Sequence, residues 1–130
     1  MLTNIMYVTL YVTDQDRALR FYTEQLGLEK RIDYPNPAGR FLTVGVPGSP
    51  VEIILSAHAP AAGQPGEVSS DTPGPVILES QDLRADFKVF RDRGVTFDRP
   101  EPVDYAFGIA IDALDPDGNR ISLRQQAVRR

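Results

Sequence analysis

The sequence contains one structural pattern twice, and this repeat limits the folds that the chain can adopt. Each copy opens with alternating apolar residues typical of a strand, continues with a helix that begins at an aspartate and ends at a glycine, and then returns to strands. Asp14 in the first copy aligns with Asp82 in the second, and Gly27 aligns with Gly94 after a one-residue offset. The period is about half the chain, too long for a solenoid, so we expect the two copies to pair within one domain.

The first copy predicts a strand, a helix and three further strands. Residues 5–12 alternate between an apolar face and a face that carries Tyr7, Thr9 and Tyr11. A helix of about three turns follows, with its N-cap at Asp14. The further strands are expected at 28–34, 41–46 and 51–56, separated by turns rich in proline and glycine.

The second copy repeats this order after an exposed connector. Residues 57–74 are rich in Ala, Pro, Gly and Ser and show no apolar periodicity, which is typical of a loop. The expected boundaries are therefore a first module at about 1–56, a linker at about 57–74 and a second module at about 75–126, all within one domain of residues 1–130. Near the end, Asp115–Asn119 has the composition of a tight turn that leads into a last strand at 120–125.

Composition excludes several classes of function. Fourteen basic and eighteen acidic residues give a formal charge of -4, which argues against a nucleic-acid partner. The chain has no apolar run long enough to span a membrane and no secretory signal, so we expect a cytoplasmic protein. It has no cysteine, which rules out disulfides and thiolate ligands, and its one histidine is His58.

Several segments together resemble the vicinal oxygen chelate superfamily, which includes glyoxalases, bleomycin-resistance proteins and extradiol dioxygenases. They cover nearly the whole chain in the family's order: Tyr7–Asp14, Ala18–Tyr22, Leu26–Leu28, Arg40–Val44, Gly94–Val95, Phe107–Gly108 and Asp115–Asn119. The resemblance implies an α+β fold of two βαβββ modules whose mixed sheets form a cupped, barrel-like structure around a cavity. It also suggests a homodimer.

The resemblance further implies where a metal would bind. In metal-dependent members, up to four inward side chains on the first, fourth, fifth and last strands hold the ion. Those positions are Tyr7, Glu52, Pro75 and Ser122 in this chain. Only Glu52 is a good ligand, and Pro75 has no donor side chain. We therefore expect no metal and no other cofactor, with a divalent metal held by unusual donors as the alternative.

The inward strand faces supply the candidate ligand-binding residues. These are Tyr7, Thr9, Phe41, Glu52, Ile54, Phe107, Ser122 and Arg124. Each has a simpler interpretation: Tyr7 and the phenylalanines could fill the core, and Glu52 could pair with an arginine such as Arg124. For residues 107–113 the pattern leaves both faces open, since either Ile109 and Ile111 or Ala110 and Asp112 could point inward.

Other polar residues favour structural roles. His58 lies in the connector and is expected to be solvated. Asp115 and Asp117 resemble a metal pair, but their turn favours hydrogen bonds to backbone N–H groups. Arg120 is expected at the surface, although a guanidinium can also bind an anionic ligand.

These observations favour a protein that binds a small molecule in the cupped sheet without a metal. The alternative is a lyase, isomerase or dioxygenase-type enzyme that acts on a carbonyl or vicinal-oxygen substrate, with Glu52 as base or as the one conventional metal ligand. A third possibility is an interaction module whose cavity is filled by its own side chains.

Overall fold

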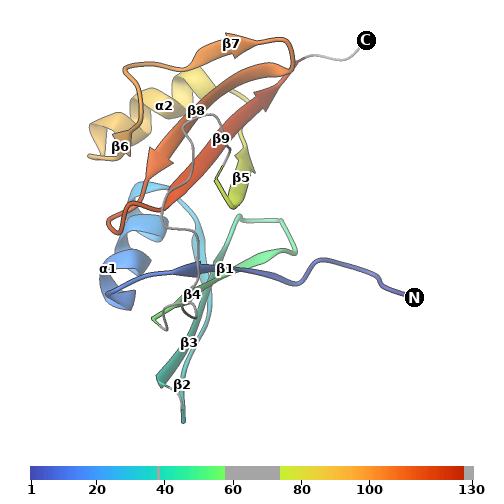
Figure 1. Ribbon diagram of the computed structural model, residues 1–130, viewed down its shortest axis with the longest axis vertical. Helices are drawn as coiled ribbons and strands as arrows, with labels where there is room; N and C mark the ends of the chain where they lie inside the picture. The colour runs from blue at the N-terminus through green and yellow to red at the C-terminus, as the bar shows by residue number, and fades with distance from the viewer. Residues whose placement is uncertain (38, 58–73, 128–130) are drawn as a thin grey trace, which may run out of the picture. The chain divides into compact units, whose positions relative to one another are not determined.

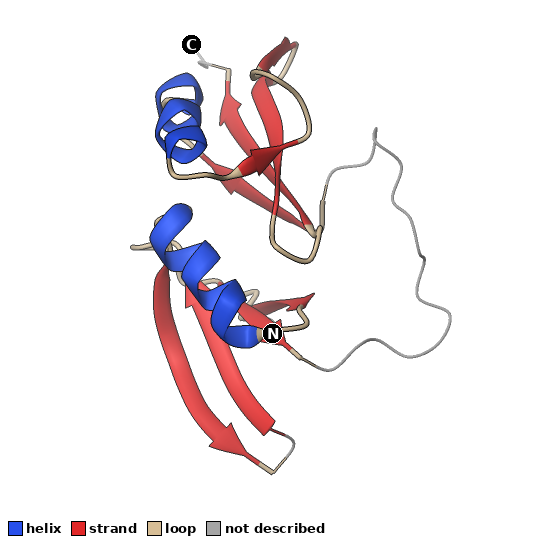
Figure 2. Cartoon of the chain, turned by 90° about the vertical axis from the view of Figure 1, so that its left-hand side faces the viewer, coloured by secondary structure: helices blue, strands red, loops and turns tan. Residues whose placement is uncertain are grey.

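The chain folds into two units, each a β-sheet with helical structure on one face (Figures 1 and 2). The computed structural model describes residues 1–37, 39–57 and 74–127. One unit spans Met1–Gln64 and the other Pro65–Arg130. Most of the predicted connector, with His58, lies outside the described residues. The module boundaries expected from the sequence therefore stay a prediction.

The first unit is a βαβββ module, as predicted. Its sheet has the order β1-β4-β3-β2, in which β1 is parallel to β4 and the other neighbours are antiparallel. The elements in chain order are β1 (Tyr7–Tyr11), α1 (Gln15–Arg20), η1 (Phe21–Gln25), β2 (Glu29–Asn36), β3 (Gly39–Gly45) and β4 (Glu52–Ser56).

The predicted helix of the first unit consists of two kinds of turn. Asp14 caps its start, because the carboxylate accepts a hydrogen bond from the backbone N–H of Arg17 at 3.1 Å. After α1 the backbone widens into the π-helical turn η1, where the N–H of Leu26 donates to the carbonyl of Phe21 at 3.0 Å. Tyr22 in this turn is fully buried, so the wide turn contributes to the core.

The second unit repeats the module and adds a short strand. Its sheet has the order β5-β9-β8-β6, with β7 paired to β8. Its elements are β5 (Val76–Glu79), α2 (Leu83–Asp92), β6 (Thr96–Phe97), β7 (Val103–Tyr105), β8 (Gly108–Leu114) and β9 (Arg120–Gln126). Strand β7 was not predicted, because three residues are too few to show a periodicity. No helix in the described ranges is long and apolar enough to cross a membrane.

In each unit, one face of the sheet packs beneath the helix and forms the core. Leu10, Leu42 and Leu55 lie at 0–2% exposure in the first unit. In the second unit the buried side chains come from β5, β8, β9 and α2 and include Val76, Leu83, Phe87, Ile111, Ala113, Ile121 and Leu123. The buried apolar residues fall on alternate positions of β8, as predicted, whereas on β3 and β9 the intervening Thr43 and Ser122 are buried too.

The core also decides which face of β8 is open. Ile111 and Ala113 are buried, at 3% and 0% exposure. Because successive side chains in a strand point to opposite faces, Ala110 and Asp112 lie on the open face, where their partners across the ladder are Arg124 and Ser122. The structure thus selects the second of the two patterns that the sequence left open.

Arg40 joins the β2–β3 hairpin to α1 in the first unit. Its guanidinium binds both carboxylate oxygens of Asp33 on β2 at 2.8 Å and one oxygen of Asp16 on α1 at 2.7 Å. The hydrogen bonds from Arg40 lower the pKa of Asp33 from its usual value of 3.8. A carboxyl whose pKa is lower in the folded state stabilises the fold above its unfolded pKa, and this contribution is lost as the pH falls through the folded pKa.

We therefore expect Arg40→Gln to lower the free energy of unfolding by about 1 kcal/mol at neutral pH. The difference from the wild type should shrink in acid, as Asp33 becomes protonated. Urea unfolding at a series of pH values measures both effects. Arg84→Gln is the matched control, because Arg84 makes one exposed ion pair with Asp104, at 3.1 Å. An equal loss in the two variants, or a loss for Arg40→Gln that does not change with pH, would contradict this account.

Candidate ligand-binding site

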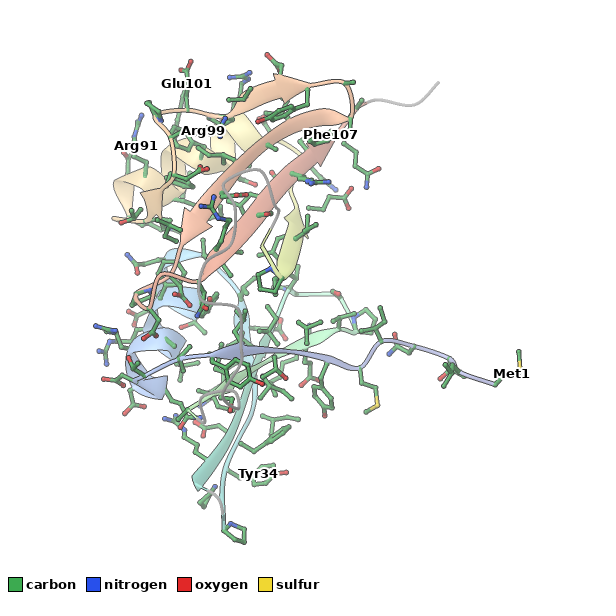
Figure 3. The ribbon with its side chains drawn as sticks, viewed as in Figure 1. Met1, Tyr34, Arg91, Arg99, Glu101 and Phe107 are labelled. Carbon is green, nitrogen blue, oxygen red and sulfur yellow. The ribbon has the colours of Figure 1, made fainter. Side chains whose placement is uncertain are left out.

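The open face of the first sheet carries three aromatic side chains in contact. Tyr7 on β1 meets Phe41 on β3 edge to face, with ring centres 5.9 Å apart, and Phe41 stacks on Tyr34 of β2 at 5.6 Å. Tyr7 is 36% exposed and Tyr34, which is labelled in Figure 3, is 52% exposed, so the cluster presents apolar surface to solvent. The sequence interpretation missed Tyr34 because an irregularity between Lys30 and Ile32 shifts the register of β2 against β3.

Glu52 lies on the same open face and is held by a neighbour. The buried hydroxyl of Thr43 on β3 donates a hydrogen bond to Oε1 of Glu52 at 2.7 Å. The same hydroxyl accepts the N–H of Ile32 at 3.1 Å, which fixes its direction. Thr43 was not predicted, although its place two residues after Phe41 on one strand puts it on the same face. A role for Glu52 as a base stays a prediction.

Thr9 and Ile54 occupy the middle of this face. They are direct partners in the parallel ladder between β1 and β4, as Tyr7 and Glu52 are two positions earlier. The predicted site residues of the first unit, including Phe41, therefore share one face. Residues two positions apart on a strand point to the same face, as Tyr7 and Thr9 do on β1 and Glu52 and Ile54 do on β4. The pairing of β1, β4 and β3 then places these faces side by side.

The open face of the second sheet carries a stack of three planar groups. The guanidinium carbon of Arg124 lies 4.6 Å from the ring centre of Phe107. Tyr105 stacks on Phe107 at 5.1 Å with only 7° between the rings. The sequence predicted Phe107 and Arg124 but not Tyr105, which lies on the unpredicted strand β7.

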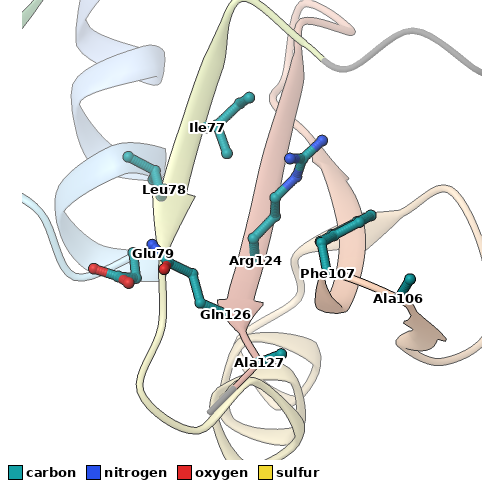
Figure 4. A pocket seen from close by; sticks show the side chains of 8 residues that line it. All are labelled: Ile77, Leu78, Glu79, Ala106, Phe107, Arg124, Gln126 and Ala127. Atoms are coloured by element: carbon teal, nitrogen blue, oxygen red, sulfur yellow. The ribbon is translucent and has the colours of Figure 1, made fainter. Parts of the chain in front are cut away.

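A pocket of about 550 Å³ opens beside this stack (Figure 4). Arg124 points into the space between Ile77 on β5 and Phe107, whereas the carboxylate of Glu79 points away from it. The volume lies within the range of known small-molecule sites. The lining residues are Ile77, Leu78, Glu79, Ala106, Phe107, Arg124, Gln126 and Ala127.

Gly108 holds Phe107 in place at the start of β8. Its φ of +138° lies in a region that L-residues rarely adopt, and a Cβ there would overlap the backbone oxygen of Gln125. The carbonyl of Phe107 accepts the N–H of Ala127 at 2.8 Å. The close approach of β8 to β9, which only glycine permits, therefore fixes the aromatic platform of the pocket.

Ser122 is buried and serves the backbone. It is 2% exposed, and its hydroxyl accepts the N–H of Gly74 at 3.0 Å. This hydrogen bond joins the segment before β5 to β9. Ser122 lies on the predicted face of β9, but its oxygen has a structural partner.

Arg120 also has partners, rather than projecting into solvent as expected. Its guanidinium donates to Asp112 on β8 at 2.8 Å and to Asp98 at 3.2 Å. The hydrogen bond to Asp112 raises the pKa of Arg120 above its usual value. The turn before β9 behaves as predicted, since one oxygen of Asp115 accepts the backbone N–H groups of Asp117 and Asn119 at 2.9 and 2.8 Å.

The four positions that would hold a metal do not offer a suitable donor set. Pro75 has no donor side chain, Ser122 accepts the N–H of Gly74, and Glu52 accepts the hydroxyl of Thr43. A phenol such as that of Tyr7 is a poor ligand unless it is deprotonated. A catalytic zinc needs three or more nitrogen, oxygen or thiolate ligands, so these residues do not fit a resident metal ion.

A family model and one relative are similar to this chain over most of its length. The sequence model of the Glyoxalase/Bleomycin resistance protein/Dioxygenase superfamily matches residues 4–123. The protein YetH of Bacillus subtilis (strain 168) is 27% identical over 126 residues, which are 96% of this chain and 100% of YetH.

Two solved structures are similar over nearly their whole length. TnmS3, an antibiotic binding protein from Streptomyces sp. CB03234, is 29% identical with a TM-score of 0.80, covering 97% of this chain and 98% of TnmS3. A member of the same superfamily from Sphaerobacter thermophilus DSM 20745 is 32% identical with a TM-score of 0.80, covering 96% and 98% of the two chains.

Replacing Gly108 tests whether the close approach of β8 to β9 fixes the position of Phe107. We expect Gly108→Ala to cost about 3 kcal/mol or more in unfolding free energy, because the methyl group meets backbone that cannot move aside. Gly118→Ala is the matched control: its φ is +83°, but no atom lies within 4 Å of the added methyl. That change should cost about 1 kcal/mol. Equal losses of stability in urea titrations would show that the contact with β9 is unimportant.

Proposed function

The chain belongs to the glyoxalase/bleomycin resistance protein/dioxygenase superfamily, and we propose that it binds a small molecule by aromatic contact without a metal ion. The carrying observation is the set of aromatic side chains on the open sheet faces. Tyr105 and Phe107 are 45% and 44% exposed, and Tyr34 is 52% exposed. Large apolar side chains gathered on a surface are costly to leave in water and commonly mark a binding site.

The similarity to an antibiotic binding protein supports this proposal. TnmS3 resembles this chain over nearly the full length of both proteins. Aromatic rings supply broad apolar contact, and a few polar groups fix the orientation of a bound compound. In this chain those polar groups are Glu52 with Thr43 in the first unit and Arg124 in the second. We therefore favour an aromatic, antibiotic-like ligand.

Independence from metal is part of the proposal. One carboxylate oxygen of Glu52 and the hydroxyl of Ser122 accept internal hydrogen bonds, at 2.7 and 3.0 Å. A cation at these positions would gain few ligands, because Pro75 offers no donor side chain. Ligand affinity should accordingly come from the exposed rings.

A screen of aromatic antibiotics by thermal shift, followed by calorimetry, tests this function. We expect at least one compound to raise the melting temperature and its affinity to be unchanged by EDTA. Phe107→Ala should lower the affinity for that compound about tenfold or more, because a stacking ring is lost. Val89→Ala is the control, since Val89 is 44% exposed on α2, away from the pocket. A stoichiometric transition metal in the purified protein, with binding lost on chelation, would contradict the proposal.

We also propose that the protein is a homodimer and that it is cytoplasmic. Met1, Leu2, Ile5 and Met6 precede β1 and are 61–118% exposed, which favours burial against a partner. Strand β1 lies at an edge of its sheet, where unpaired backbone groups can pair with another chain.

Sedimentation velocity tests the dimer. We expect twice the mass of the 14.4 kDa chain at micromolar concentration. Replacing Ile5 and Met6 by serine should shift the equilibrium toward monomer, because apolar contact area is lost. Replacing the exposed Val89 by serine is the control and should leave the mass unchanged. A wild-type protein that sediments as a monomer would rule this proposal out.

A further inference from the structure

Arg124 differs in its partner from the other arginines on the described strands, of which Arg31 pairs with Glu29 at 3.5 Å. Arg40 and Arg120 each bind two carboxylates. Within the described ranges, Arg124 makes no ion pair with a carboxylate and instead lies over the ring of Phe107. Glu79 on β5 is the direct partner of Arg124 in the parallel ladder with β9, yet the two side chains form no ion pair.

The stacked arrangement leaves the donors of Arg124 available. The contact with the ring of Phe107 engages the guanidinium through its charge, and a guanidinium carries five N–H donors in a planar fork. Figure 4 shows this group directed into the space between Ile77 and Phe107, within the pocket of about 550 Å³. A planar fork of N–H donors matches the two oxygens of a carboxylate or a similar anion.

The surroundings strengthen the attraction for an anion. Arg124 is half-buried between apolar neighbours, and Ile77 and Phe107 remain 49% and 44% exposed. Charges interact more strongly beside apolar surface than in bulk water. The carboxylate of Glu79 lines the same pocket but points away from Arg124, so it does not occupy the donor fork.

We propose that this pocket selects a flat aromatic compound that carries an anionic oxygen group, with Arg124 pairing with the anion and Phe107 and Ile77 contacting the ring. This inference rests on the proposed function and adds to it the charge of the ligand. The stack on Phe107 holds the guanidinium ready, so that little side-chain entropy is lost when the anion binds.

A pair of probes that differ only in charge tests the inference. Naphthalene-2-carboxylate is an anion at neutral pH, and 2-naphthamide is a neutral compound of nearly the same shape. Calorimetry or competition binding should show that the wild type prefers the acid by about tenfold, as expected for one charge-assisted pair. Arg124→Gln should bring the ratio of the two affinities close to one.

Two further variants separate charge from structure. Arg91→Gln makes the same charge change on α2, where Arg91 lies 5.6 Å from the ring of Phe87, and it should keep the preference for the acid. Arg124→Lys keeps the charge but loses the planar fork, so it should retain only part of the preference. Circular dichroism and melting temperature identify any variant that fails to fold.

The outcomes distinguish this inference from the proposed function. Equal wild-type affinities for acid and amide, or a preference that survives in Arg124→Gln, would overturn the inference while leaving small-molecule binding intact. Failure of both probes to bind, while a compound from the antibiotic screen still binds, would also overturn the inference alone. If no compound of either charge binds, both proposals fail.

Discussion

Burial of one face of each sheet beneath its helix is the constraint on which the rest of the structure depends. Side chains such as Leu42 and Leu55 in the first unit, and Ile111 and Ile121 in the second, are almost completely removed from water. Because side chains alternate along a strand, a shift of one position would expose this whole set. The same alternation places the polar and aromatic residues of each strand on the opposite, open face.

The two modules keep their framework and differ on their open faces. Asp14 and Asp82 both cap a helix. The open face of the first unit combines an aromatic cluster with the carboxylate of Glu52, whereas that of the second combines an aromatic stack with the guanidinium of Arg124. A duplicated fold can change these positions without loss of stability, since few of them contribute to the core.

Hydrogen bonds within the protein engage several of the polar side chains on the open sheet faces. Thr43 holds Glu52, and the backbone of Gly74 holds Ser122, so two of the four positions at which metal-dependent relatives place ligands serve the fold. Arg120 is likewise occupied by Asp98 and Asp112. Arg124 is different, because its contact is with the ring of Phe107 rather than with a carboxylate. Ligand binding through rings and one cation is consistent with these arrangements.

The sequence by itself determined the order of the elements other than β7, the caps at Asp14 and Asp82, the turn at Asp115, and the open face of β1, because each depends on local propensity or strand alternation. It also predicted Phe107 and Arg124 as candidate ligand-binding residues, and both line one pocket. It did not predict Tyr34, which depends on a register shift in β2, or Tyr105, which depends on the pairing of β7 with β8. The partners of Glu52, Ser122 and Arg120, and the open face of β8, were decided only by the tertiary structure. These features depend on which residues of neighbouring strands face each other, and the alternation within a single strand carries no information about that register.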